Sequence, residues 1–180
     1  MRKSMVVLLC GVSCVIGGLA QRGFAKAPKP TFDPAVLQGS DTKAIAGKLL
    51  DQALVLAGDG SWERIAVGRV WYLGGDKAKG QQIFDGVTGG KKVADSDWFR
   101  IARVYAQAKD WEKADAAFGM ALALDPEDDD GMVEQASYMN LQGDRAKAEA
   151  VFAKVIAAQP DKMYHYTNAA GSYLGVIPQD

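Results

Sequence analysis

The residues best suited to catalysis or metal binding are few in this sequence. The chain of 180 residues has one histidine, His165, and two cysteines, Cys10 and Cys14. A zinc site needs several such ligands, and a cysteine nucleophile needs a histidine base beside it. The sequence therefore predicts no catalytic residue, no metal site and no cofactor. His165, between two tyrosines, is predicted to be a surface or partly stacked side chain of the last helix.

An acidic run from Asp125 to Asp130, followed by Gly131, comes nearest to a calcium-binding loop. The spacing of such a loop would place Pro126 at the first ligand and Ser137 at the last, where a carboxylate is needed. The motif fails at both ends. The run is instead predicted to be a loop between helices, whose acids favour the N-terminus of the next helix.

Composition and charge limit the classes of partner. Apolar residues make up 48% of the chain and charged residues 24%, which indicates a soluble, packed protein. Lysine and arginine number 21 against 22 acidic residues, a net charge of -1. Proteins that bind nucleic acid mainly through charge carry a basic excess. Nucleic acid is therefore not expected as a partner.

Residues 1–25 have the features of a secretory signal peptide. Arg2 and Lys3 precede a short apolar run, and small residues allow cleavage after Ala20 or Ala25. The alternatives are a retained membrane anchor or a lipid on Cys14, although Gly11 stands where a lipoprotein signal usually has leucine. The protein is predicted to be exported, most simply to a bacterial periplasm. Contact with a membrane is expected only if this segment is uncleaved or lipidated.

Removal of the signal would change the mature chain in two ways. Both cysteines would be lost, so no disulfide could form and stability would come from packing. Three basic residues and no acidic one would also be lost, leaving 18 basic against 22 acidic residues. Residues 26–40 follow and contain Pro28, Pro30 and Pro34, which predicts an extended linker. Residues 41–57 then carry the apolar spacing of a helix.

The chain repeats itself with a period of 34 residues. Ala114, Phe118 and Pro126 recur as Ala148, Phe152 and Pro160 at that spacing. One position of the repeat always holds a small residue, which allows two helices to approach closely. The position three residues later holds a large residue, which fills the space beside that contact. Aspartates recur after each turn, where a carboxylate can cap the next helix. These series are Gly68, Ala102, Ala136 and Ala170; Trp71, Tyr105, Met139 and Tyr173; and Asp76, Asp110 and Asp144.

Residues 95–128 resemble a tetratricopeptide repeat. The matching places of the family pattern are occupied by Trp98, Ile101, Ala102, Tyr105, Ala114, Phe118, Ala121 and Pro126. Units 129–162 and, more weakly, 61–94 follow the same pattern, and residues 163–176 resemble one further first helix. The resemblance implies an all-α fold for residues 41–180: a right-handed superhelix of antiparallel helix pairs, or α-solenoid.

The same resemblance implies a concave face that binds a peptide or helix of a partner protein. The first helix of each unit lines that face. The residues predicted for this groove are Trp62, Ile65, Arg69 and Tyr72, then Phe99, Arg103 and Gln107, then Val133, Ser137 and Asn140, with Tyr164 at the end. Aromatic residues and arginine often carry most of the binding energy in protein interfaces.

Three functions remain open on the sequence. The first is a non-enzymatic interaction module or scaffold of the cell envelope, motivated by the export signal and the repeat. The second is a structural component that self-associates through its apolar last helix, because repeat arrays without a polar cap tend to associate. The third is a small exported enzyme or ligand carrier that uses the groove as a pocket. The family subtype that grips a partner's C-terminal carboxylate is not expected, since Ile65 and Glu134 stand at two of its basic or amide places.

Overall fold

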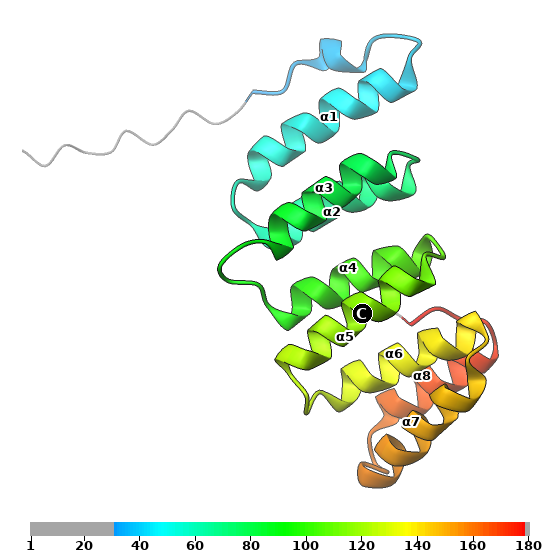
Figure 1. Cartoon of the computed structure of the whole chain (residues 1–180). Helices are drawn as coiled ribbons and strands as arrows, with labels where there is room; N and C mark the ends of the chain where they lie inside the picture. Colours follow the sequence, from blue (N-terminus) through cyan, green and yellow to red (C-terminus); the bar gives the residue numbers. More distant parts are fainter. Residues whose placement is uncertain (1–30, 179–180) are drawn as a thin grey trace, which may run out of the picture. The chain divides into compact units, whose positions relative to one another are not determined.

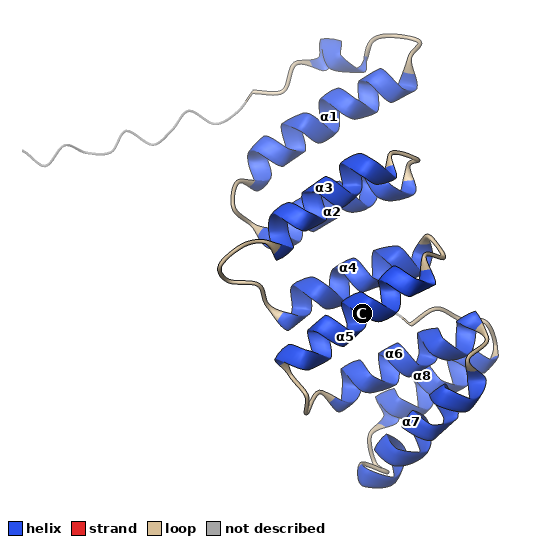
Figure 2. Cartoon of the chain, in the orientation of Figure 1, coloured by secondary structure: helices blue, strands red, loops and turns tan. Residues whose placement is uncertain are grey.

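A computed structural model of the chain describes residues 31–178. The signal peptide prediction, Cys10 and Cys14 lie outside these residues. Contacts divide the chain into Met1–Pro34 and Ala35–Asp180, and the α-helices of the described residues belong to the second part. The described part contains helices and no strand (Figures 1 and 2), which confirms the all-α prediction. The helices are α1 (Thr42–Ala57), α2 (Ser61–Leu73), α3 (Lys77–Thr88), α4 (Asp95–Gln107), α5 (Trp111–Leu124), α6 (Asp129–Gln142), α7 (Arg145–Ala158) and α8 (Met163–Tyr173), preceded by a 3₁₀ turn, η1 (Pro34–Leu37).

The helices pack as successive pairs. Helix α2 packs mainly on α3, α4 on α5, and α6 on α7, while α1 lies against α2 and α8 lies against α6 and α7. This is the solenoid of helix pairs that the repeat predicts. The right-handed sense of the superhelix stays a prediction. Two boundaries differ from those expected: the last helix ends at Tyr173, before the predicted end at residue 176, and part of the proline-rich segment forms the turn η1 instead of extended chain.

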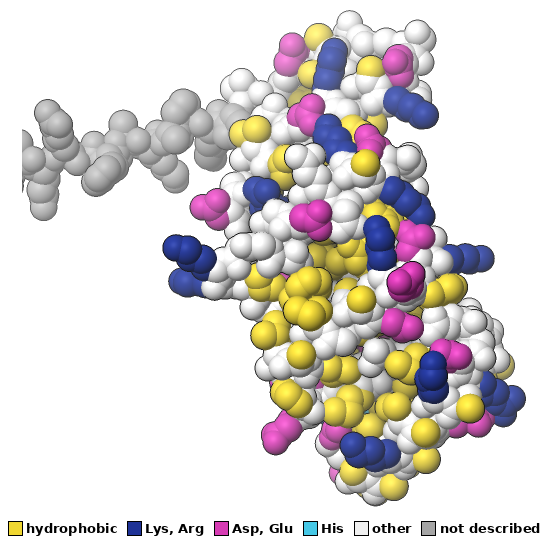
Figure 3. All heavy atoms as spheres, in the orientation of Figure 1, with side chains coloured by type: hydrophobic (Ala, Val, Ile, Leu, Met, Phe, Trp, Pro, Cys, Tyr) yellow, Lys and Arg dark blue, Asp and Glu magenta, His cyan; other side chains and the backbone are white. Residues whose placement is uncertain are grey.

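The surface carries both signs of charge. On the face seen in Figure 3, acidic and basic side chains are interspersed, and hydrophobic side chains reach the surface between them. Interspersed charges of both signs create no large electrostatic field of one sign on this face. Within residues 31–178, no helix is both long enough and apolar enough to cross a membrane.

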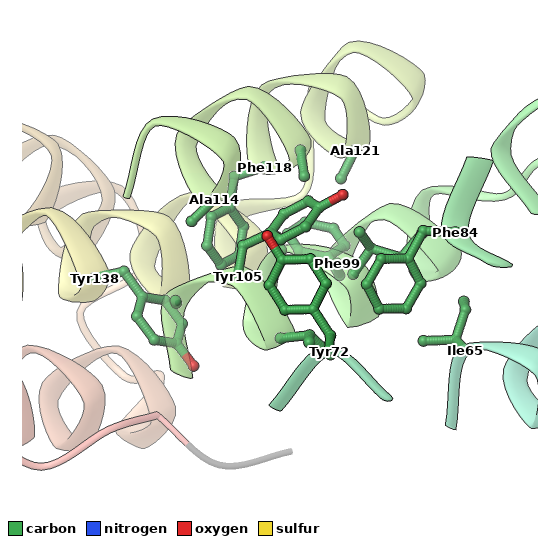
Figure 4. Close-up of a cluster of buried hydrophobic side chains, with 14 of the residues drawn as sticks. Ile65, Tyr72, Phe84, Phe99, Tyr105, Ala114, Phe118, Ala121 and Tyr138 are labelled. Carbon is green, nitrogen blue, oxygen red and sulfur yellow. The ribbon is translucent and has the colours of Figure 1, made fainter. Parts of the chain in front are cut away.

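Aromatic side chains join the α2–α3 pair to the α4–α5 pair, and the α4–α5 pair to α6 (Figure 4). The ring of Phe84, on α3, lies 5.7 Å from Tyr72 of its own pair and 5.7 Å from Tyr105 of the following pair. The ring of Phe118, on α5, lies 5.9 Å from Phe99 and 5.3 Å from Tyr138 in the same manner. Aromatic pairs at these separations attract beyond the burial of their area. The repeat therefore builds a core that continues from one pair to the next.

Small residues let the two helices of a pair approach closely. A Cβ atom added to Gly80 would lie 2.7 Å from the Cβ atom of Tyr72 and 2.8 Å from the carbonyl oxygen of Gly68. A Cβ atom added to Gly68 would lie 2.6 Å from the ring of Phe84. Atoms at these distances would overlap, so positions 68 and 80 of the α2–α3 pair both require glycine.

The three repeated aspartates do not share one role. Asp76 caps α3, since its side chain accepts a hydrogen bond from the backbone N–H of Lys79 at 3.0 Å. The capping prediction is wrong for the other two. Asp110 accepts hydrogen bonds from Lys77 Nζ at 2.8 Å and from the Tyr72 hydroxyl at 2.7 Å, and these bonds, the one from Lys77 most of all, hold the pKa of its carboxyl below the usual value. Asp144 pairs with Lys147 Nζ at 2.8 Å. Asp110 thus ties two helix pairs together instead of capping one helix.

Candidate partner-binding face

The first helices of the pairs line two adjoining hollows, which together we call the groove face. The hollow between α2 and α4 has a volume of about 160 Å³, and the hollow between α4, α6 and α8 has a volume of about 380 Å³. They adjoin because Arg100 and Arg103 line both. The first is lined by Trp62, Ile65, Ala66, Arg69, Arg100, Arg103, Val104 and Gln107, and the second by Phe99, Arg100, Arg103, Asp128, Asp130, Gly131, Glu134 and Tyr164.

Five of the eleven residues predicted for the groove line it with accessible side chains. Trp62 is 51% exposed, Arg69 and Gln107 are exposed, and Arg103 and Tyr164 are half-buried. The sixth, Asn140, is half-buried but lines neither hollow. Its amide nitrogen donates to Ser172 Oγ at 2.9 Å, which joins α6 to α8.

The other five predicted residues are buried, although two of them, Ile65 and Phe99, also line the hollows. Tyr72 is 1% exposed, Phe99 is 6% exposed and Ser137 is 0% exposed. Tyr72 and Phe99 turn their rings into the aromatic core, and the Ser137 hydroxyl donates to the carbonyl of Val133, one turn earlier in the same helix. Val133 is buried as well. A helix offers only one side to the groove, and these residues lie toward the core.

Basic and aromatic side chains occupy the α2–α4 half of the groove face. The guanidinium of Arg100 lies 3.8 Å from the centroid of the exposed Trp62 ring. Arg69 donates two hydrogen bonds, of 3.2 and 3.0 Å, to the side-chain oxygen of Gln107. Among residues 31–178, neither Arg69 nor Arg100 forms an ion pair. A carboxylate brought to this surface would therefore meet two arginines beside an aromatic ring.

Acidic side chains dominate the other half, but most of them already have partners. Arg103 holds Glu134 through two hydrogen bonds of 2.6 and 2.7 Å, and Glu134 is 3% exposed. Asp130 pairs with Lys162 Nζ at 2.8 Å. Burial, reinforced by the negative charge of Glu134, raises the pKa of Tyr164 to about 12, so its hydroxyl stays neutral at physiological pH. This half can accept hydrogen bonds from a partner, but its carboxylates are largely neutralised by the cations that already bind them.

His165 lies on the last helix as predicted, but it is not a surface residue. Its side chain is 0% exposed, and Nε2 lies 2.9 Å from Oδ1 of Asp130. The other ring nitrogen, Nδ1, is buried without a hydrogen-bond partner in the described structure. The contact joins α8 to the first turn of α6. Within residues 31–178, no group of three or more His, Cys, Asp and Glu side chains could hold a metal ion.

The acidic run before α6 has the role that the sequence predicts. The carboxylate of Asp128 accepts a hydrogen bond from the backbone N–H of Gly131 at 2.9 Å, and Asp129 and Asp130 lie in the first turn of α6. Carboxylates in that position favour the positive end of the helix dipole. Of the lining residues that the sequence did not predict, Arg100 bears most directly on binding, because it is the one with a positive charge. Its position three residues before Arg103, on the same side of α4, was the available signal.

Comparison with known proteins identifies one part of the chain. A family model described as "Tetratricopeptide repeat" matches residues 96–128, which cover α4 except for its first residue, and all of α5. Neither the curated proteins nor the solved structures gave a match to this chain. Repeats of that family generally mediate protein–protein interaction and are typically not enzymes. The α4–α5 segment, whose first helix lies at the centre of the groove face, is thus similar to a tetratricopeptide repeat.

Proposed function

We propose that this protein is a non-enzymatic interaction module that holds an extended, acidic segment of a partner protein on its groove face. The observation that carries the proposal is the α2–α4 half of that face. Two arginines without ion pairs in the described structure flank an exposed tryptophan there. Arginine binds carboxylates through two parallel hydrogen bonds, and an aromatic ring gives apolar area to the neighbouring side chain.

The contact between Arg69 and Gln107 favours this reading. An arginine hydrogen-bonded to a neutral amide keeps its full charge, and the amide bonds can be exchanged for stronger bonds to a carboxylate. Arg103, by contrast, already holds the carboxylate of Glu134. The partner's acidic residue is therefore expected to lie over α2 and α4 near Arg69, with an apolar residue against Trp62.

Selection from a random peptide library tests the proposal. Peptides retained by the immobilised protein are expected to be rich in Asp or Glu next to an apolar residue. Trp62→Ala and Arg69→Ala are each expected to weaken the binding of a selected peptide by about tenfold or more, because residues of this kind dominate interface energetics. Fluorescence polarisation with the labelled peptide measures the dissociation constants.

Two control variants make the result specific. Lys154→Ala removes an exposed positive charge on α7, away from both hollows, and is expected to leave the dissociation constant unchanged. Arg69→Lys keeps the positive charge but loses the planar, two-pronged set of N–H donors. Its dissociation constant for the peptide is therefore expected to lie between those of Arg69→Ala and the unaltered protein. Enrichment of basic or purely apolar peptides, or equal binding by all four variants, would refute the proposal.

We further propose that the module works outside the cytoplasm, in the cell envelope and most simply in a bacterial periplasm. The support is the sequence of residues 1–25, with its basic start, short apolar run and small residues before two cleavage points. Expression of the full chain in a bacterium should yield a periplasmic protein whose N-terminal sequencing begins at Gln21 or Lys26. A cytoplasmic product that retains residues 1–20 would contradict it.

A further inference from the structure

Exposed apolar side chains gather at the two ends of the stack of helices. Helix α1 exposes Leu49 at 37%, Val55 at 77% and Leu56 at 61%. At the other end, the exposed apolar residues are Met163, Tyr166 and Tyr173 on α8 and Leu174, Val176 and Ile177 directly after it. The terminal units of a solenoid normally need polar outer faces to remain separate molecules. Both ends of this one lack such a face among the described residues.

Helix α1 has the residues of a second helix, and no first helix precedes it among residues 31–178. Ala46, Leu49 and Leu50 stand 34 residues before Gly80, Ile83 and Phe84, which α3 buries against α2. Ala46 and Leu49 are exposed and Leu50 is half-buried. The described residues before α1 form only the short turn η1. The residues that α3 uses to bind its own first helix thus have counterparts on α1 over which no helix packs in residues 31–178, although Ala46 and Leu50 also line the hollow of about 730 Å³ between α1 and the α2–α3 turn.

Helix α8 has the complementary defect. Ala170 stands at the small place of a first helix, three periods of 34 after Gly68, and Leu174 stands three periods after Tyr72. The equivalent small residues Gly68, Ala102 and Ala136 are buried under the second helix of their pair. Ala170 is exposed and Leu174 is 81% exposed, while residues 174–178 form no helix that could cover them.

The α2–α3 pair shows how the two uncovered faces would fit. There, the Cα position of Gly80 approaches Gly68 and Tyr72 so closely that an added Cβ atom would be 2.7 to 2.8 Å from their atoms. The corresponding contact would bring Ala46 of α1 to Ala170 and Leu174 of α8. Leu49 and Leu50 would then cover Ala170 as Ile83 and Phe84 cover Gly68. The two alanines are slightly larger than the two glycines, so the helices would lie slightly further apart.

We propose that copies of this protein associate head to tail, with α1 of one copy packing on α8 of the next as α3 packs on α2. Helices α1 and α8 lie at opposite ends of the stack (Figure 1), so they cannot meet within one copy. The two faces differ, and such a heterologous contact leaves a free face at each end and can extend into a chain of copies. The association extends the groove face from one copy to the next and goes beyond the binding of a partner proposed above.

Charge placed at the centre of either face tests this association. Ala46→Glu and Ala170→Glu alter exposed alanines on α1 and α8, and Ala123→Glu alters an exposed alanine on α5 as the matched control. The weight-average mass of the unaltered protein and of the control is expected to rise with concentration in analytical ultracentrifugation. Each of the other two variants alone is expected to keep the monomer mass, because a carboxylate cannot be buried unpaired in an apolar contact. Circular dichroism confirms that each variant is folded.

Mixing the two variants separates head-to-tail contact from other arrangements. The intact α8 of the Ala46→Glu copy can bind the intact α1 of the Ala170→Glu copy, and both remaining faces carry a glutamate. The mixture is therefore expected to reach twice the monomer mass and to stop there. A monomer at every concentration of the unaltered protein would overturn the proposal. Association lost in only one variant, as two identical faces would give, would overturn it equally.

Discussion

Replacing Phe118 with alanine is expected to lower the free energy of unfolding by about 3–5 kcal/mol. The ring is 0% exposed and contacts both Phe99 in its own pair and Tyr138 in the next, so its loss opens a cavity at the junction between two pairs. The surrounding helices can move to fill such a cavity only in part. The range of expected losses corresponds to more or less complete filling of the cavity. Urea unfolding followed by circular dichroism measures the change.

A second variant on the same helix shows whether the effect belongs to this position. Met120 is 48% exposed, and Met120→Ala is expected to change the free energy of unfolding by about 0.5 kcal/mol or less. Phe118→Leu, which retains much of the volume, is expected to cost less than Phe118→Ala. A loss below about 1 kcal/mol for Phe118→Ala would mean that the contacts of Phe118 with Phe99 and Tyr138 do not hold the helix pairs together. Other contacts would then have to stabilise the solenoid.

Arg103→Met is expected to destabilise the fold by about 3 kcal/mol or more, although the residue lies on the groove face. The cost arises from Glu134, which is 3% exposed and would lose the two hydrogen bonds that compensate its buried charge. Replacing both residues with methionine removes the charge along with its partner. The double variant is therefore expected to recover most of the loss, and a double-mutant cycle measured by urea unfolding gives the coupling.

Arg100 provides the control for this experiment. It lies on the same helix and the same face, but its contact is the ring of Trp62 instead of a carboxylate. Arg100→Met is expected to cost about 1 kcal/mol or less, the range of an exposed cation–π contact. If Arg103→Met and Arg100→Met destabilise equally, the Glu134 carboxylate is not effectively buried. Arg103 variants are therefore unsuitable for binding studies, because a loss of binding could arise from destabilisation of the fold as well as from a lost contact with the partner.

The two halves of the groove face therefore differ in what they can do. In one half the charged groups hold the fold together, as Arg103 and Glu134 do between α4 and α6. In the other half Arg69, Arg100 and Trp62 make contacts that a partner could replace at little cost. This difference is why the binding proposal rests on the α2–α4 half alone.

Sequence reasoning located the helices because the 34-residue period records the core. Ala114, Phe118 and their equivalents are constrained by contacts inside and between pairs, and such contacts leave the same residue type at the same spacing. Helix order and pairing followed from that spacing. The groove residues were harder to predict, since Tyr72, Phe99 and Ser137 lie on first helices yet belong to the core. A turn of helix separates lining from core by only one or two residues, and the repeat does not fix that rotation.

What the sequence alone determined was the all-α fold, the order of its helix pairs and the absence of the residue sets that common metal sites and cysteine nucleophiles require. Tertiary structure alone decided the partners of the charged groups. It placed His165 in the interior against Asp130, turned Asp110 from a helix cap into a link between pairs, and left Arg69 and Arg100 without carboxylates in the described structure. The reason is physical. Core packing requires side chains of a given size at a constant sequence spacing, so it can be recognised in the sequence. An ion pair instead depends on where two side chains from distant segments meet in space.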